Sequence, residues 1–423
     1  MAADSGPSCQ PSARGSAVGE AFEQPMTAPI AESRDAPALA SGSSVAKSAP
    51  PLIQAGSPLR MRFMAIWIGM LALLVLCALV VPRSLLPSTF LAIIPLAAFL
   101  GITAIGEALV LMARGIDLSI PAIITLSSTI ILGFSRGREE YAVAATVGAL
   151  FFATAIGVVN GVLVAVFKLN ALIVTLAIGA ITSGATLWYR ESLPAEARVP
   201  PGMAELGDAR LLGLNVSVWV GAVLVVMLSV GLRKTTVGRR FSAVGANPRA
   251  AWVAGINVTI YEFAAYVVAG LLYGVVGILL SAFIRNPTLK VGDPYLLAPI
   301  AAAVLGGTAI SGGIGSMTAV AGAALFLTQL GQMLKMLGLS SAFQFIIQGA
   351  AIGFGMAVAG VDLQRPAELF LRARGRTADL PGSAEDAARG REDKANRLAH
   401  APADPPRSGA DRSRAFDRDA RGP

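Results

Sequence analysis

Charged residues and histidine are scarce in this chain of 423 residues, and both shortages exclude classes of protein. Asp, Glu, Lys and Arg make up 14% of the chain, against 54% hydrophobic residues, whereas soluble domains carry roughly 25% charge. So few charges cannot cover a soluble surface of this size. The single histidine, His400, leaves almost no room for imidazole catalysis or a histidine metal site. The two cysteines, Cys9 and Cys77, are too few for a disulfide framework or a cysteine zinc site.

The chain also lacks the motifs of common catalytic sites. A phosphate-binding GxxxxGK[ST] loop is missing, because neither Lys47 nor Lys234, which precede Ser or Thr, follows a glycine. Neither a GxSxG nucleophile turn nor an HExxH helix occurs. The glycine-rich run Gly306–Gly315 lies between apolar segments with no strand before it, so it is predicted to be a tight turn between helices. We therefore expect no enzyme, no cofactor and no metal. The chain is expected either to move a solute itself or to hold another component that moves it.

Composition divides the chain into three regions. Residues 1–58 are rich in Ala, Ser, Pro and Gly, and residues 363–423 are dense in Arg, Asp, Glu and Pro. Neither region can bury enough apolar surface to offset its ordering entropy, so we predict two disordered tails. Between them, residues 59–362 are predicted to form a polytopic transmembrane domain in the lipid bilayer. The net charge of +8 then reflects cytoplasmic loops and tails, and no nucleic-acid partner is expected.

The transmembrane domain consists of continuous apolar runs near the ~20 residues that a helix needs to cross a bilayer. This predicts an all-α integral membrane protein of about ten helices, some of them broken. The predicted spans are 63–82, 89–113, 117–134, 141–167, 169–188, 216–232, 259–284, 294–310, 316–335 and 341–361. The second and third are separated only by Arg114-Gly115-Ile116, so they also fit one long broken helix. Lysine and arginine, concentrated at 233–249, predict that both termini and tails face the cytoplasm.

Charged residues mark the second and third spans. Glu107 lies inside a span, and Asp117 lies at the break after it. An unpaired charge costs at least ~2.5–3.5 kcal/mol at mid-membrane, so Glu107 is expected to face protein or water. Arg114 and Asp117 are charges at the break, near an interface, where this cost is smaller. Asp117 with Ser119 also fits a helix cap, with Pro121 in the first turn. Such a cap does not exclude a role in a solute pathway.

A basic loop, Thr235–Val258, is the second notable segment. Asn247-Pro248 fits the start of a helix, and Gly255 fits its end. A short helix here would suit docking of a partner protein, with a small-residue face of Ala250, Ala251 and Ala254 against that partner. The alternative is an interfacial linker anchored by Trp252.

At these residues the chain resembles permease subunits of ABC sugar importers of the ribose type, in the wider group that includes branched-chain amino-acid permeases. The resemblance covers about residues 90 to 360. The stretches that carry it are Gly115–Ser119, Asn160–Ala165, Leu172–Leu176, Thr235–Ile256 and Ala302–Gly315. The chain departs from the family pattern at Ile120-Pro121-Ala122, at Arg249 and Trp252, and in its longer tails.

The resemblance implies a permease of the bacterial inner membrane. Its partners would be a second permease copy, a separate ABC ATP-binding subunit and an extracytoplasmic solute-binding protein. The candidate residues of the substrate pathway are Glu107, Asp117, Ser119, Asn160, Thr175 and Gln329. The candidate ATPase-coupling loop contains Gly238, Arg239, Gly245, Asn247, Pro248, Arg249, Ala250, Ala251, Gly255 and Ile256.

Three alternatives remain open at this point. The first is an ion-coupled secondary transporter with its site at broken helices, in which Glu107 or Asp117 would relay protons or sodium. The second is an ABC permease for a non-sugar solute such as an amino acid. The third is a membrane scaffold whose tails recruit partners.

Overall fold

The structure of this chain is a computed structural model that describes residues 58–194, 197–340, 342–344, 346–350, 353 and 395. These residues belong to the unit that runs from Ala55 to Pro423. The predicted disordered tails lie almost entirely outside the described residues. Much of the predicted span 341–361 does so too.

Most of the described chain is helical, and the strands among the described residues form one short antiparallel hairpin, in which Arg210 pairs with Asn215. The elements in chain order are α1 Pro58–Val80, η1 Pro82–Leu85, α2 Pro87–Met112, α3 Ile120–Ser135, η2 Glu139–Tyr141, α4 Ala142–Gly161, the π-helix η3 Val162–Val166, α5 Ala171–Glu191, α6 Pro201–Asp208, β1 Arg210–Leu211, β2 Leu214–Asn215, α7 Val216–Lys234, α8 Thr236–Ala246, α9 Pro248–Val253, α10 Val258–Ile284, η4 Asp293–Tyr295, α11 Ala298–Leu305 and α12 Met317–Met336.

Within the described residues, seven helical segments are long and apolar enough to cross a membrane: those containing α1, α2, α4, α5, α7, α10 and α12. They confirm the prediction of an all-α membrane protein. Two other predicted spans contain shorter helices, because α3 has 16 residues and α11 has 8. At 1.5 Å per residue these helices reach about 24 Å and about 12 Å, less than the ~30 Å hydrocarbon core. The predicted number of ten spans is therefore not confirmed.

Each of the two short helices follows a long helix, and the segment that connects them turns back into the bundle. After α2 ends, residues 113–119, called the break below, return along α2 until the backbone N–H of Asp117 reaches Glu107. After α10 ends, residues 285–297 return in the same way before α11 begins. The second returning segment meets α3 where the N–H of Gly292 donates to the Thr125 hydroxyl in the second turn of α3, at 3.2 Å. The two discontinuous helices thus begin inside the helical bundle.

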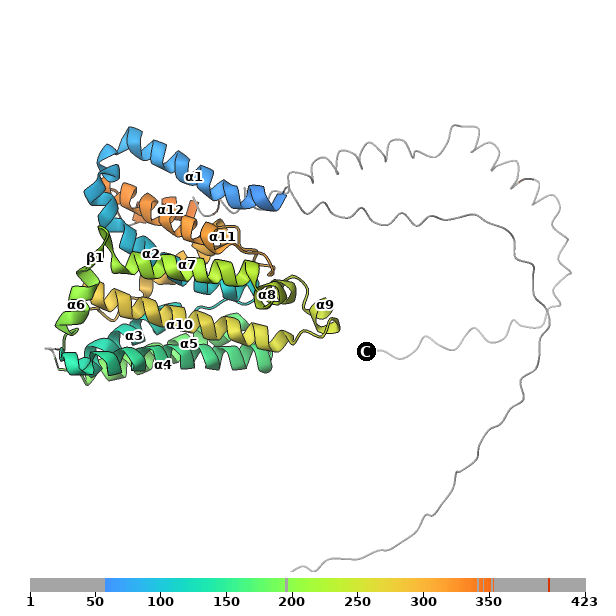
Figure 1. Ribbon diagram of the computed structural model, residues 1–423, viewed down its shortest axis with the longest axis horizontal. Coiled ribbons are helices and arrows are strands. Elements are labelled where there is room, and N and C mark those ends of the chain that lie inside the picture. Colours follow the sequence, from blue (N-terminus) through green and yellow to red (C-terminus); the bar gives the residue numbers. More distant parts are fainter. Residues whose placement is uncertain are drawn as a thin grey trace, which may run out of the picture. The chain divides into compact units, whose positions relative to one another are not determined.

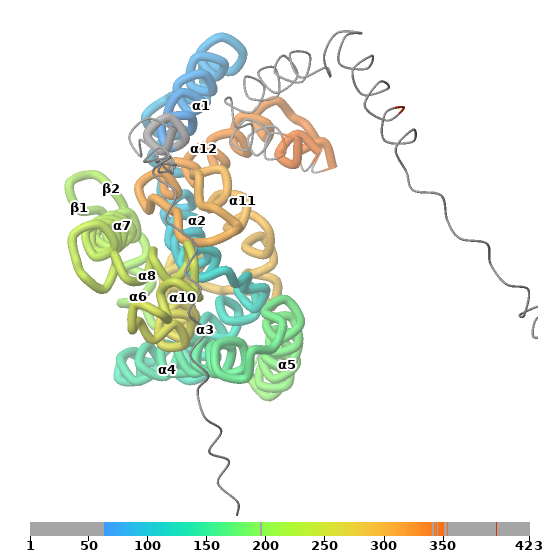
Figure 2. Tube along the Cα trace, turned by 90° about the vertical axis from the view of Figure 1, so that its right-hand side faces the viewer, coloured from blue at the N-terminus to red at the C-terminus, as the bar shows by residue number. Residues whose placement is uncertain are grey.

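Helices α2 and α10 form the centre of the bundle, and most residues in the second half of α2 are buried. In the view along the helices, α1 and α12 lie on one side of this centre and α4 and α5 on the other (Figure 2). Glycines let α4 and α10 approach closely, since a Cβ at Gly270 would lie 2.7 Å from the carbonyl oxygen of Ala153. Such small-residue contacts are typical of helix packing in membranes.

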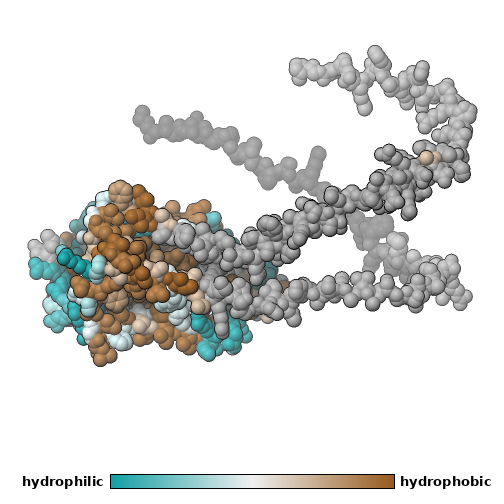
Figure 3. All heavy atoms as spheres, turned by 90° about the horizontal axis from the view of Figure 1, so that it is seen from above, coloured by the Kyte–Doolittle hydropathy of each residue, from teal (hydrophilic) through white to brown (hydrophobic). Residues whose placement is uncertain are grey.

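The bundle has two distinct ends (Figure 1). One end, the α8 end, carries α8 and α9, and there Arg233 of α7 donates to Ser316 ahead of α12 at 2.8 Å. The opposite end, the α6 end, carries α6 and the β-hairpin, and there Arg285 pairs with Asp208. The face shown in Figure 3 is largely hydrophobic across its middle, with hydrophilic residues gathered towards the two ends. This distribution is the one expected for a protein that lies across a bilayer.

Candidate functional site

A buried polar network surrounds the break between α2 and α3. Glu107, in the middle of the bundle, is fully buried. Both oxygens of its carboxylate lie 3.3 Å from the backbone nitrogen of Asp117, and the Tyr273 hydroxyl of α10 donates to Oε2 at 3.3 Å. Glu107 therefore holds the returning backbone of the break against α2 and α10.

Asp117 and Ser119 organise the start of α3. Asp117 Oδ1 accepts hydrogen bonds from the Ser119 backbone N–H at 2.8 Å and from the Ser119 hydroxyl at 2.5 Å. The amide of Asn160 in α4 donates to the same hydroxyl at 2.9 Å. All three side chains are fully buried. The N-cap residue of α3 is Ser119, and no side chain caps this helix, so the predicted cap is not formed. Asp117 instead closes an Asp–Ser turn just ahead of α3, and this turn is joined to α4 through Asn160.

Thr175 of α5 binds the break from another side. Its hydroxyl accepts from the Leu118 N–H at 3.0 Å and lies 3.4 Å from the carbonyl oxygen of Ile116. Glu107, Asp117, Ser119, Asn160 and Thr175 thus converge on one segment, although they come from α2, α4, α5 and the break itself. We call these five residues the polar network.

Gln329, the sixth candidate, lies elsewhere. It is buried on α12, and its amide nitrogen lies 3.6 Å from the sulfur of Cys77 on α1. The structure therefore does not bring it together with the polar network.

The polar network retains hydrogen-bonding capacity. Asp117 Oδ2, Asn160 Oδ1 and the Tyr266 hydroxyl are buried and lack a partner among the described residues. None of the ion pairs in the described part of the chain involves Glu107 or Asp117. Buried polar groups are costly when unpaired. A change of conformation, or a bound polar molecule, that supplied hydrogen bonds to these atoms would therefore be stabilised.

The segment predicted to couple to a partner is a pair of short helices at the α8 end. The Thr235 hydroxyl accepts from the N–H of Gly238 at 3.1 Å and caps α8, and the Asn247 side chain accepts from the N–H of Ala250 at 3.1 Å and caps α9. Gly255, at φ +78°, ends α9, and the Ile256 N–H returns to the Ala251 carbonyl at 3.0 Å. These bonds form a Schellman motif, so the predicted helix and its end at Gly255 are confirmed.

The exposed face of α9 agrees with the predicted one at Ala250 and Ala254 but not at Ala251. Ala251 is only 5% exposed and packs against its own chain, so it is not part of a partner-facing surface. Trp252 and Val253, by contrast, are 72% and 79% exposed. The physical reason is that α9 has only six residues and packs on the bundle through Ala251. The residues on its other sides therefore point away from the bundle. Arg249 and Ala250 are also exposed, as is Arg239 on α8, whereas Pro248 and Ile256 are half-buried.

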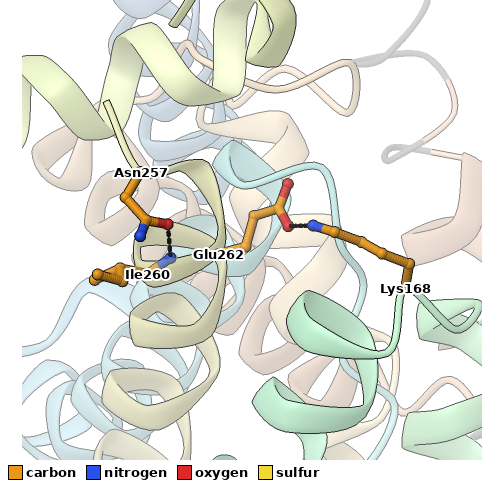
Figure 4. Close-up of polar contacts among 4 residues, drawn as sticks. All are labelled: Lys168, Asn257, Ile260 and Glu262. Carbon is orange, nitrogen blue, oxygen red and sulfur yellow. Dashed lines mark hydrogen bonds and ion pairs between the residues drawn. The ribbon is translucent and has the colours of Figure 1, made fainter. Parts of the chain in front are cut away.

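An ion pair joins the start of α10 to the segment between η3 and α5. Lys168, between η3 and α5, binds Glu262 in the second turn of α10 at 2.7 Å, and Asn257 caps α10 through the N–H of Ile260 (Figure 4). Both contacts lie at the α8 end of the bundle but outside α8 and α9.

Sequence reasoning missed two contributors to the site. Tyr273 lies within a long apolar run and does not stand out in the sequence. Only the packing of α10 against α2 brings its hydroxyl to Glu107. Arg114 was recognised as a charge at the break, but not its partners, which are backbone carbonyls of α8. A backbone carbonyl leaves no signal in the sequence.

Comparison with known proteins places the chain among transport permeases. It is 32% identical to the ribose import permease protein RbsC of Bacillus subtilis over 287 residues, which cover 68% of this chain and 89% of the relative. It is 28% identical to the L-arabinose ABC transporter permease protein AraH of Azospirillum brasilense, covering 67% and 83%. It is 27% identical to the galactose/methyl galactoside import permease protein MglC of Escherichia coli, covering 68% and 91%.

No solved structure matches the chain significantly. Residues 89–355 match the family described as branched-chain amino acid transport system / permease component. This range contains the whole polar network and both helices α8 and α9. The chain therefore belongs to the family of branched-chain amino acid transport system permease components.

Proposed function

We propose that the chain is the membrane permease subunit of an ATP-driven importer for a sugar or a related small polar solute. The observation that carries this proposal is the match to the ribose, arabinose and galactose permeases over 89%, 83% and 91% of their lengths. The family match over residues 89–355 includes the polar network and helices α8 and α9. The lack of a phosphate-binding loop in the sequence fits a subunit that relies on a separate ATPase.

In this proposal the chain is a multi-pass protein of the bacterial inner membrane. The α8 end faces the cytoplasm and binds an ABC ATPase subunit through α9. The α6 end faces outward and receives solute from a binding protein. A second copy of the chain completes the translocation pathway. The exposed Trp252 and Val253 support docking of a partner through α9, because an apolar pair on a short helix provides an anchor for a partner protein.

The polar network is proposed to be the part of the pathway that rearranges. In the described conformation its five side chains are buried, so α2, α3, α4, α5 and α10 are held together around the break. Movement of the half-helix α3 relative to α2 would expose carboxylate, amide and hydroxyl groups. These are the groups that form hydrogen bonds with the hydroxyls of a sugar.

Uptake into proteoliposomes tests the solute class and the energy source. With the ATPase and binding-protein subunits reconstituted and ATP supplied at the ATPase side, labelled ribose, arabinose or galactose should accumulate, and labelled leucine should not. Accumulation should persist when ionophores collapse ion gradients, since ATP alone drives it. Transport by the permease alone, driven by an imposed ion gradient, would favour the secondary transporter. Leucine uptake would favour an amino-acid permease.

Orientation is testable with single cysteines at the two ends of the bundle. In a variant that lacks Cys9 and Cys77, Leu212→Cys in the β-hairpin turn should react with an impermeant thiol reagent on intact cells. Val237→Cys on α8 is the matched control and should react only after the cells are opened. Leu212 and Val237 are 84% and 62% exposed, so access to both is limited by the membrane alone. The reverse pattern would contradict the proposed orientation.

A further inference from the structure

Arg114 joins the break to α8 through two hydrogen bonds. Its Nε donates to the Gly245 carbonyl at 2.7 Å, and its terminal nitrogen donates to the Ala246 carbonyl at 2.8 Å. Gly245 and Ala246 are the last two residues of α8. Their carbonyls have no partner within the helix, and the end of a helix carries partial negative charge, so a guanidinium is well suited to bind there.

The backbone of Arg114 adopts a conformation that glycine usually supplies. Arg114 has φ +69° at the end of α2, where its own N–H returns to Leu111 and the Gly115 N–H returns to Val110, both at 2.9 Å. These bonds form a Schellman motif, in which glycine is the common residue at this position. An arginine pays a conformational cost here, and its side-chain bonds to α8 provide the compensating interaction.

Glycines bring three segments into direct backbone contact around Arg114. The Gly313 N–H donates to the Met112 carbonyl at 2.9 Å. A Cβ at Gly312 would lie 2.5 Å from Cγ of Arg114, and a Cβ at Gly245 would collide with the Met112 carbonyl oxygen. The end of α2, the end of α8 and the turn 306–316 therefore pack backbone against backbone, and the Arg114 side chain is enclosed among them. A displacement of α8 cannot be absorbed there by flexible groups.

The same junction leads directly to the polar network. Asp117 follows Arg114 by three residues, a span of at most about 10 Å. Gly115 lies between them, and a Cβ there would lie 3.0 Å from both Val110 Cγ1 and Tyr266 Cζ, so the path is confined. The position of Arg114 thereby constrains where Asp117 meets Glu107 and where α3 begins.

We propose that Arg114 is a positioning residue for coupling: it transmits movement of α8 and α9 to the break and so to the polar network. This proposal rests on the proposed function, in which α9 binds the ATPase. The bidentate pattern requires arginine, because lysine offers a single point of contact and cannot hold two carbonyls in the same geometry.

The test uses the assembled transporter with Arg114→Ala, Arg114→Lys and, as a control, Lys168→Ala. Lys168 is a cation at the same end that binds the Glu262 side chain instead of α8. Arg114→Ala should co-purify with the ATPase in normal amount and hydrolyse ATP, yet transport about tenfold less solute per ATP or lower. Arg114→Lys should fall between Arg114→Ala and the native protein, and Lys168→Ala should transport normally. A normal ratio of solute to ATP in Arg114→Ala would overturn the proposal, as would an equal loss in Lys168→Ala.

A second measurement separates this proposal from the proposed function. In the purified permease alone, hydrogen exchange at the amides of Asp117 and Ser119 should be faster in Arg114→Ala than in Lys168→Ala. This comparison requires neither ATPase nor solute. Equal exchange rates at these amides would show that Arg114 does not hold the break. If native permease binds no ATPase but the exchange rates differ, the proposed function fails while the structural link stands.

Discussion

Asp117→Ala should abolish solute uptake, whereas Asp117→Asn should retain a substantial part of it. The alanine removes the acceptor of two hydrogen bonds and leaves the N–H and hydroxyl of Ser119 unpaired inside the bundle. Each buried group left without a partner costs about 1–3 kcal/mol. The start of α3 would then lose its defined position. Asparagine keeps an oxygen at the Oδ1 position and preserves the turn.

The measurement is uptake per permease molecule present in the membrane, which separates transport from abundance. Asp208→Ala is the matched control, because Asp208 is an exposed aspartate paired with Arg285 at the α6 end. Exposed ion pairs contribute about 0–1 kcal/mol, so this variant should transport normally. Full activity of Asp117→Ala would remove the break from the mechanism.

Glu107→Gln distinguishes the two energy sources at the same site. Glutamine keeps the size of the side chain and retains one oxygen as an acceptor for the Asp117 N–H. In an ATP-driven permease this variant should assemble normally and change uptake without altering how it depends on pH. Complete loss of uptake together with loss of its pH dependence would instead favour proton relay by Glu107.

Trp252→Glu should release the ATPase subunit from the permease. Trp252 is 72% exposed on α9, and large aromatic residues are the usual anchors of a protein interface. Removal of such an anchor typically costs 2 kcal/mol or more, roughly a thirtyfold loss of affinity. Glutamate adds a charge that the partner's pocket would have to bury unpaired. The variant should reach the membrane at normal abundance, purify without ATPase and fail to accumulate solute.

Leu169→Glu is the control for this result. Leu169 is 49% exposed at the same end of the bundle but lies outside α8 and α9. It should retain the ATPase, because the added charge lies away from the proposed docking helix. If Trp252→Glu also kept both the ATPase and full uptake, α9 would not be the docking element. Ala251→Trp does not serve this test, because Ala251 is buried against its own chain and a tryptophan there would disturb the permease itself.

The sequence by itself determined the class of the protein and the location of its important segments. The apolar runs defined the seven long helices, because in lipid the backbone must satisfy its own hydrogen bonds within each span. Local rules were equally sufficient for α9, whose Asn-Pro start and glycine end depend only on neighbouring residues. The charges at Glu107 and Asp117 indicated a functional break, since their cost in a membrane requires a reason.

Only the tertiary structure decided how those segments meet. Hydropathy cannot tell a helix that crosses the bilayer from a half-helix such as α11, because both are apolar when buried in protein. It cannot show that Asn160 and Thr175 reach the same break, or that Gln329 does not, because the three lie on similar apolar helices and differ only in the direction they face. The partners of Arg114 are backbone carbonyls, and every residue has one. Which carbonyl it binds is fixed by the glycine contacts that bring α8 against the end of α2.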